Sequence, residues 1–317
     1  MSVGDAAGET SPVALSVPFD TIDAGQPIIE SNQPSGSSTL QVTWKAGTPV
    51  HNDTTPGDPL DVNLPVTYQP AYRVGTAAPV LVGQPTTNTT ATVTGPKPPY
   101  SLTVRAVNEW TYISSDPVNA QPIGFTTSIP TWVIAGTDTV IKGTYTGPDS
   151  ATITLQARNS ATSAWYGVGG YAFTGHTYQF TVPSRGTRDY RIAVSNSQDP
   201  IAKTGWFGGY SGIVKTTTQL KATVLLGAST VYRSSTPVNA VLTVNPASSG
   251  TASLQRWNGT TWVAVANVPF TSGRGTGHLS AATAGTFTYR FYVPAQTYNG
   301  LPVAAAYSPN FTVKVLP

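Results

Sequence analysis

Short segments in which apolar and polar residues alternate recur along most of this chain. An alternation with a period of two, carried by β-branched and aromatic residues, is typical of half-buried strands. Clusters of Gly, Pro, Asn and Ser separate the segments, and no longer window has the 3.6-residue period of a helix. The sequence therefore predicts an all-β protein. The clearest alternating segments are 40–44, 102–106, 152–156, 178–182, 241–244 and 311–315.

An internal repeat in the last two thirds of the chain predicts its organisation. The interval from Leu155 to Tyr190 equals that from Leu254 to Tyr289, 35 residues. A repeat of about one hundred residues with several short strands has the size of a β-sandwich domain. We therefore expect two sandwich domains, at 125–218 and 219–317. Two further pairs recur 97 residues later, Phe173-Thr174 as Phe270-Thr271 and Tyr210-Ser211 as Tyr307-Ser308.

The second copy carries a strand that ends in Leu254-Gln255-Arg256, a following strand that opens with Trp262, and a later segment from Gly285 to Arg290. This pattern resembles the bacterial immunoglobulin-like modules of surface and secreted proteins from Gram-positive, especially actinobacterial, hosts and from their phages. The first copy carries the corresponding segment from Gly186 to Arg191. The resemblance implies two immunoglobulin-like sandwiches, with Tyr190 and Tyr289 in strands that cross the core.

Residues 36–124 differ from the two repeats. The segment Leu40–Trp44 resembles the second strand of a fibronectin type III domain, and 96–108 resembles the tyrosine-corner strand of that family. Ser114–Pro117 stands where the family has its Ser-x-Pro exit. The resemblance implies a third sandwich in which Trp44 packs in the core. It also implies that the ring of Tyr100 is buried and that its hydroxyl bonds to upstream backbone.

Residues 1–35 contain few strand signals, and their isolated apolar side chains stand among polar residues. One interpretation is an extended N-terminal arm that docks on a neighbouring subunit. The alternatives are a disordered leader or a first strand.

Composition excludes several classes of function. The chain has no Cys, so thiolate catalysis, zinc–thiolate sites and disulfides are ruled out. The net charge is only +3 and no run of basic residues occurs, which argues against a nucleic-acid partner. No apolar stretch is long enough for a membrane span. We expect no cofactor.

Candidate catalytic and metal-binding residues are sparse. His51, His176 and His278 have no further ligand at metal-binding spacing, and a zinc site needs three or four converging ligands. The acidic segment with Asp53, Asp58 and Asp61 could supply oxygen ligands for calcium, although its prolines favour an ordinary loop. A glycosidase needs two facing carboxyl groups, and the chain has three Glu, of which Glu9 and Glu30 lie in the arm. The sequence therefore predicts a protein that is not an enzyme.

Aromatic side chains are the remaining candidates for binding. Trp44, Trp165 and Trp262 follow strand patterns and are expected in the core. The segment Lys203–Tyr210 contains Trp206, Phe207 and Tyr210 and is the one expected to expose aromatic rings to a glycan or to another protein, with ordinary packing as the alternative.

These observations lead to a structural function on the surface of a particle. The N-terminal residues show neither the charged nor the apolar region of a signal peptide, and the modules resemble those that phages carry. We expect a virion protein of a tailed phage, as a capsid decoration, a head fibre or a minor tail protein. Its partners would be other virion proteins and host-surface glycans, and homo-oligomers remain open. The alternatives are a secreted or cell-surface bacterial adhesin or polysaccharide-binding module, and a non-catalytic part of a larger hydrolase.

Overall fold

The computed structural model describes residues 22–51, 65–108, 112–172, 175–233 and 236–317. These residues form strands and turns with no helix among them, so the prediction of an all-β protein is confirmed. They divide into two compact units. Unit 1 comprises Met1–Ile123 and Asn196–Gly208, and unit 2 comprises Gly124–Ser195 and Gly209–Pro317, with only the described residues of each considered below.

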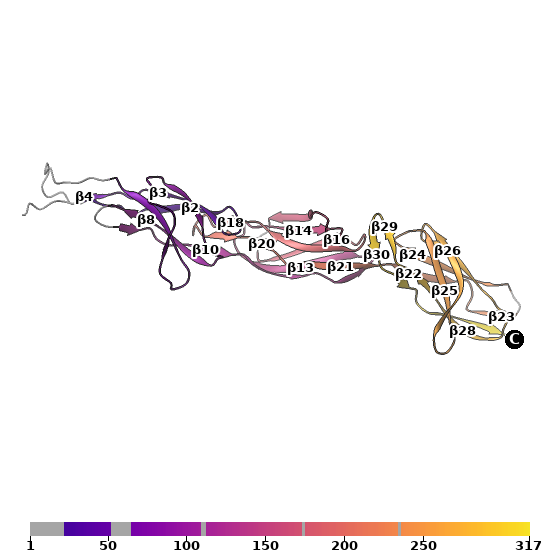
Figure 1. Cartoon of the computed structure of the whole chain (residues 1–317). Coiled ribbons are helices and arrows are strands. Elements are labelled where there is room, and N and C mark those ends of the chain that lie inside the picture. The colour runs from indigo at the N-terminus through magenta and orange to yellow at the C-terminus, as the bar shows by residue number, and fades with distance from the viewer. Residues whose placement is uncertain (1–21, 52–64, 109–111, 173–174, 234–235) are drawn as a thin grey trace, which may run out of the picture. The chain divides into compact units, whose positions relative to one another are not determined.

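Unit 1 contains two larger sheets that enclose one apolar core (Figure 1). One sheet has the order β2-β3-β7, and the other has the order β18-β19-β10-β8-β5-β6, with β9 beside β8. Buried side chains alternate with more exposed ones along several strands, as in β8, where every second residue is buried. The strands are β1 (Ile22–Asp23), β2 (Ile28–Pro34), β3 (Thr39–Lys45), β4 (Val50–His51), β5 (Thr67–Arg73), β6 (Val80–Leu81), β7 (Thr90–Thr94), β8 (Tyr100–Val107), β9 (Tyr112–Ser114), β10 (Val118–Pro122), β18 (Ser197–Gln198) and β19 (Gly205–Phe207).

The expectation of an arm over residues 1–35 is wrong for its last part. Residues 28–34 form β2, which pairs with β3 and buries Ile29, Asn32 and Pro34. A bulge between Ile29 and Ser31 interrupts the alternation along β2, which hides the strand in the sequence. Residues 1–21 lie outside the described part of the chain.

The first half of unit 2 also has two sheets. Their orders are β11-β13-β16 and β12-β21-β17-β14-β15, with β20 beside β17. A bulge between Leu155 and Gln156 marks the pairing of β14 with β15. The strands are β11 (Gly124–Ser128), β12 (Trp132–Ile134), β13 (Asp138–Thr146), β14 (Thr152–Arg158), β15 (Tyr166–Ala172), β16 (Thr177–Pro183), β17 (Arg188–Val194), β20 (Gly209–Tyr210) and β21 (Val214–Gln219).

The second half of unit 2 repeats this order within one continuous sheet, β22-β24-β27-β26-β25-β28-β32-β23, with β31 beside β28. The bulge recurs between Leu254 and Gln255, at the corresponding place of the repeat. The strands are β22 (Lys221–Leu226), β23 (Thr230–Tyr232), β24 (Val238–Asn245), β25 (Gly250–Trp257), β26 (Trp262–Thr271), β27 (Arg274–Leu279), β28 (Gly285–Val293), β29 (Gln296–Tyr298), β30 (Leu301–Val303), β31 (Ala306–Tyr307) and β32 (Phe311–Leu316).

One serine contact occurs three times and extends the repeat to unit 1. The Oγ of Ser115 accepts a hydrogen bond from the backbone N–H of Val104 at 3.0 Å and donates to the carbonyl of the next residue. Ser211 and Ser308 make the same pair of contacts, at 2.9 Å to the N–H groups of Ile192 and Phe291. Three segments of the chain therefore share one strand-pairing device, and the sequence repeat is visible only in the last two.

Two hairpins occupy corresponding places in the repeat. The 196–208 hairpin, with β18 and β19, follows β17, and the 296–303 hairpin, with β29 and β30, follows β28. Each hairpin is followed by two strands that pair with the strand before it. After 196–208, β20 and β21 pair with β17, and after 296–303, β31 and β32 pair with β28. Asn299 and Gly300 both have positive φ, at 50° and 76°, which is the backbone of a tight two-residue hairpin turn.

The 196–208 hairpin belongs to the fold of unit 1. Strand β19 pairs in parallel with β10, and the N–H of Ile123 donates to the carbonyl of Phe207 at 2.8 Å. Phe207 is 3% exposed and lies in the same core as Leu40 and Trp44. The Nδ2 of Asn196 donates to the carbonyl of Gly36 at 3.1 Å. The expected boundary at 125–218 therefore does not describe a separate body, since part of that segment completes the core of unit 1.

The 296–303 hairpin joins the two halves of unit 2, and its Val303 lies in the core of the second half. The N–H of Thr187 donates to the carbonyl of Pro302 at 2.8 Å, and the N–H of Ala304 donates to the carbonyl of Thr218 at 2.8 Å. Leu301 is 3% exposed, and a β-carbon added to Gly186 would lie 2.4 Å from its Cβ. The expected domains 125–218 and 219–317 are consequently hydrogen-bonded into one compact unit.

Candidate functional site

Two stacks of aromatic and guanidinium side chains are the repeated surface feature of unit 2. In the first stack, the Cζ of Arg191 lies 4.2 Å from the ring centroid of Trp165 and 3.9 Å from that of Tyr210. In the second, the Cζ of Arg290 lies 4.3 Å from the centroid of Trp262 and 3.9 Å from that of Tyr307. We call these the Arg191 stack and the Arg290 stack.

The strand register explains why these side chains meet. Gln156 of β14 stands opposite Arg191 of β17, and Tyr210 of β20 pairs beside it, opposite Ala193. The residues on either side of Arg191, Tyr190 and Ile192, are buried, so Arg191 points to the opposite face of the sheet. Its Nε donates to the Oε1 of Gln156 at 2.8 Å, which fixes the plane of the guanidinium.

The Arg290 stack has the same construction on β25, β28 and β31. Gln255 stands opposite Arg290, and the Nε of Arg290 donates to the Oε1 of Gln255 at 2.8 Å. Tyr210 and Tyr307 are 63% and 53% exposed, so each stack presents a tyrosine to solvent. A cation held against an aromatic face gains about 0.5–1 kcal/mol at such sites.

The stacks change the expected place of two tryptophans. We expected Trp165 and Trp262 in the core, and instead both are half-buried on the outer face of a sheet beneath arginines. An apolar ring in a strand pattern can be covered by a charged side chain as well as by core, because the guanidinium stacks on the ring and keeps its edge in water. Trp44, Tyr100, Tyr190 and Tyr289 lie in the interior, each 5% exposed or less.

The three residues expected to form an exposed aromatic surface are separated by the fold. Phe207 is buried in unit 1, Trp206 is half-buried there, and only Tyr210 is exposed, in the Arg191 stack of unit 2. Sequence reasoning did not select Arg191, Arg290 or their glutamine partners as site residues. The signal was present in the repeat, because Gln156 and Arg191 recur as Gln255 and Arg290 at positions that alternate with buried neighbours.

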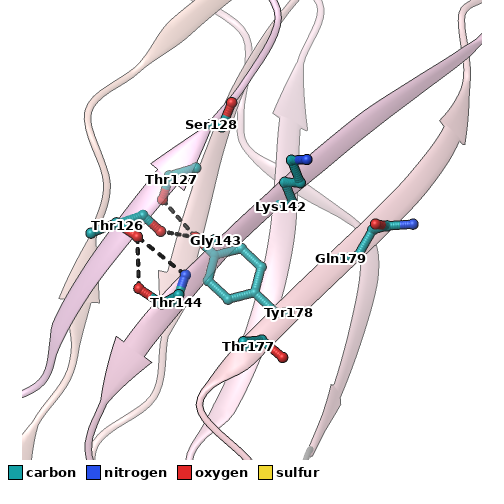
Figure 2. A pocket seen from close by; sticks show the side chains of 9 residues that line it. All are labelled: Thr126, Thr127, Ser128, Lys142, Gly143, Thr144, Thr177, Tyr178 and Gln179. Carbon is teal, nitrogen blue, oxygen red and sulfur yellow. Dashed lines mark hydrogen bonds between the residues drawn. The ribbon is translucent and has the colours of Figure 1, made fainter.

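A shallow groove crosses the outer strands β11, β13 and β16 in the first half of unit 2 (Figure 2). Its volume is about 590 Å³. The hydroxyl of Tyr178 contacts the Oγ1 of Thr127 at 2.7 Å and donates to the carbonyl of Thr126 at 2.7 Å, and burial raises the pKa of this tyrosine. The phenol therefore stays protonated near neutral pH. The lining residues are Thr126, Thr127, Ser128, Lys142, Gly143, Thr144, Thr177, Tyr178 and Gln179, with no carboxylate among them.

The histidines and acidic residues do not converge in the described part of the chain. His278 contacts the Oδ1 of Asn239 through Nδ1 at 2.8 Å, and the ring of His176 lies 5.2 Å from that of Tyr145. Among the residues that the structure describes, no three His, Asp or Glu side chains are grouped as metal ligands would be. Asp53, Asp58 and Asp61 lie outside the described residues, and His51 is described only in its backbone. The described segments also contain no helix with the length and apolarity of a membrane span.

Tyr100 departs from the expected tyrosine corner. Its ring is 3% exposed, and its hydroxyl has no hydrogen-bond partner among the described residues. A β-carbon on Gly95 would lie 2.9 Å from this hydroxyl, so the oxygen faces a glycine backbone at close range. Burial, with a smaller contribution from Tyr72, raises the pKa of Tyr100 to about 12.

The buried hydroxyl predicts a pH-dependent effect of Tyr100→Phe. At neutral pH the substitution should leave the stability of unit 1 unchanged or raise it by up to about 1 kcal/mol, because an unpartnered polar atom is removed. The folded-state pKa is above the unfolded one, so ionisation favours unfolding as pH rises from about 10 to about 12, and below about 10 it has no effect. Urea unfolding at neutral and alkaline pH should therefore show a smaller alkaline loss in the variant. A clear destabilisation at neutral pH would contradict this description of the hydroxyl.

Comparison with protein-family models and with curated proteins yields no match for this chain. The function must therefore be inferred from its own residues and geometry.

Proposed function

We propose that this chain is a non-enzymatic structural protein built from three tandem immunoglobulin-like sandwiches, the first of them similar to fibronectin type III. It would hold these modules on the surface of a tailed-phage virion, as a capsid decoration, a head fibre or a minor tail protein. Its partners would be other virion proteins at the attachment point and host-surface glycans at the exposed modules.

The strand orders support the sandwich assignment. An immunoglobulin-like domain pairs its first, second and fifth strands in one sheet and its seventh, sixth and third strands in the other. The orders β2-β3-β7 with β10-β8-β5, and β11-β13-β16 with β21-β17-β14, match this arrangement. In the second half of unit 2, the same neighbours occur in β22-β24-β27 and β32-β28-β25.

The observation that supports a structural role is the pair of hairpins at corresponding places in the repeat, 196–208 between β17 and β20 and 296–303 between β28 and β31. Each hairpin bonds to a segment that precedes its own sandwich, β10 for 196–208 and the end of β21 for 296–303. The first hairpin lies wholly in unit 1, and the second joins the two sandwiches of unit 2 by backbone hydrogen bonds and a buried side chain, in addition to the covalent linker. Such a joint suits a spacer or a display support, because a flexible linker would leave the two sandwiches of unit 2 free to reorient.

The test is the location of the protein in the organism that encodes it. Phage particles released by that host, or carrying this gene, should contain the chain after gradient purification, measured by mass spectrometry. Electron microscopy of particles that lack the gene should show loss of a surface density. Recovery of the chain only in the particle-free fraction would refute the virion proposal.

A second candidate is a bacterial adhesin or polysaccharide-binding module on the cell surface, which the two exposed stacks favour. This alternative predicts that the chain fractionates with the cell wall of bacteria that carry no phage. The same fractionation therefore separates the two candidates.

A further inference from the structure

The Arg191 and Arg290 stacks reproduce one set of side chains on the outer face of two successive sheets. In each, an arginine, a tyrosine and a glutamine come from neighbouring strands, and the tryptophan is Trp262 of β26 in one and Trp165, just before β15, in the other. Core packing does not demand these residues, because they lie on the face opposite the buried side chains. The next outer position along the strand differs between the two copies: it is Ala193, two residues after Arg191, in one and Tyr292, two residues after Arg290, in the other. The repeated part is the arginine with its rings.

Each arginine keeps hydrogen-bond donors available. The Nε of Arg191 and of Arg290 is taken by a glutamine, whereas their terminal nitrogens have no acceptor among the described residues. Arg158, beside the first stack, differs in this respect. Its Nε lies 2.9 Å from the Oδ2 of Asp189 and its Nη1 donates to the carbonyl of Ala161 at 2.8 Å. Arg158 also lies over the ring of Trp165, at 4.7 Å, but its charge is paired with Asp189, whereas Arg191 and Arg290 have no carboxylate partner among the described residues.

The geometry of a stacked guanidinium favours an anionic ligand. The aromatic rings pack on the guanidinium, and the glutamine fixes its plane. Because the arginine side chain is already held in place, it loses little rotamer entropy when its terminal nitrogens bind a ligand. Those nitrogens fit a carboxylate or a phosphate with two parallel hydrogen bonds. Tyr210 and Tyr307, which contact these arginines, are 63% and 53% exposed, and the ring of Tyr292 lies 5.0 Å from that of Tyr307. An aromatic ring can cover the apolar face of a sugar.

We propose that the two stacks are equivalent binding sites for the anionic sugars of an acidic polysaccharide, with the arginine binding the carboxylate or phosphate and the tyrosine contacting the sugar ring. A polymer that repeats its charged sugar could engage both sites of unit 2, which multiplies the affinity of either. This inference does not depend on whether the chain is anchored to a virion or to a cell.

Surface plasmon resonance with the full chain tests the proposal on three immobilised polymers: polygalacturonate for carboxylates, phosphorylated dextran for phosphates, and neutral dextran. We expect binding to at least one anionic polymer and none to dextran, and the polymer bound identifies the anion. Arg191→Met and Arg290→Met should each weaken that binding by about tenfold or more. The double variant should lose it.

Arg105→Met is the matched control, since among the described residues Arg105 lies over one ring, that of Tyr112 at 4.6 Å, instead of between two, and its loss changes net charge by the same amount. It should change the affinity by no more than about twofold. Thermal unfolding of every variant separates loss of binding from loss of folding. Arg191→Lys and Arg290→Lys, which keep the charge but not the planar fork, should also bind more weakly. Wild-type affinity in the double methionine variant, equal binding to dextran, or no binding to any polymer would overturn the proposal.

Discussion

Phe207→Ala is expected to lower the free energy of unfolding of unit 1 by about 3–5 kcal/mol, the usual cost of removing a buried phenylalanine. Phe207 is 3% exposed in the core formed with Leu40, Trp44 and Tyr100, although almost a hundred residues separate it from the rest of that core. Amide hydrogen exchange resolved by peptide measures the effect locally. Protection should fall in β3 and β8 of unit 1.

Ile201→Ala is the control for this prediction. Ile201 lies in the turn of the same hairpin and is 91% exposed, so its truncation should change stability by less than about 0.5 kcal/mol. If both variants leave the exchange of β3 and β8 as it is in the wild type, Phe207 does not belong to that core.

Gly186→Ala is expected to destabilise unit 2 by about 2–4 kcal/mol, from two causes. Gly186 has φ of 156°, which side chains rarely adopt, and an added β-carbon would lie 2.4 Å from the Cβ of Leu301. Leu301 is buried in the joint between the two halves of unit 2, so it has little room to move. Guanidinium unfolding measures the change in free energy.

The repeat supplies a matched control for the glycine variant. Gly285 corresponds to Gly186 and has φ of 150°, but its added β-carbon would meet only the ring of Phe287, at 3.2 Å or more. Gly285→Ala therefore reports backbone strain without the clash at the joint. We expect Gly186→Ala to cost about 1–3 kcal/mol more than Gly285→Ala. Equal costs would mean that the hairpin contact at Leu301 contributes nothing.

Much of the local structure could be predicted from the alternation of side chains. The segments 40–44, 152–156 and 311–315 lie within β3, β14 and β32, whose buried residues alternate as expected. Alternation succeeds there because one face of each strand packs on a core and the other faces solvent. Alternation did not predict β2, because a bulge between Ile29 and Ser31 changes which residues of the strand face the core.

The partners of each strand could not be predicted from local patterns. Nothing near Phe207 in the sequence indicates that it packs against β3 instead of its own neighbours, because that choice depends on contacts between distant segments. The stacks were missed for another reason. Trp165 and Trp262 look like core residues by hydrophobicity, and only the geometry places a guanidinium over each. Gln156 and Arg191 recur as Gln255 and Arg290, but a sequence repeat alone does not show that they share one face of a sheet.

The most direct test of the central claim, that the 196–208 hairpin completes the core of unit 1, is hydrogen exchange in a chain whose residues 196–208 are replaced by a short glycine linker. The amide of Ile123 donates to the carbonyl of Phe207, and β10 pairs with β19. The account predicts that protection of 118–123 and of the core strands β3 and β8 falls sharply, while β25 and β28 keep theirs. Unchanged protection in β3, β8 and β10 would contradict it.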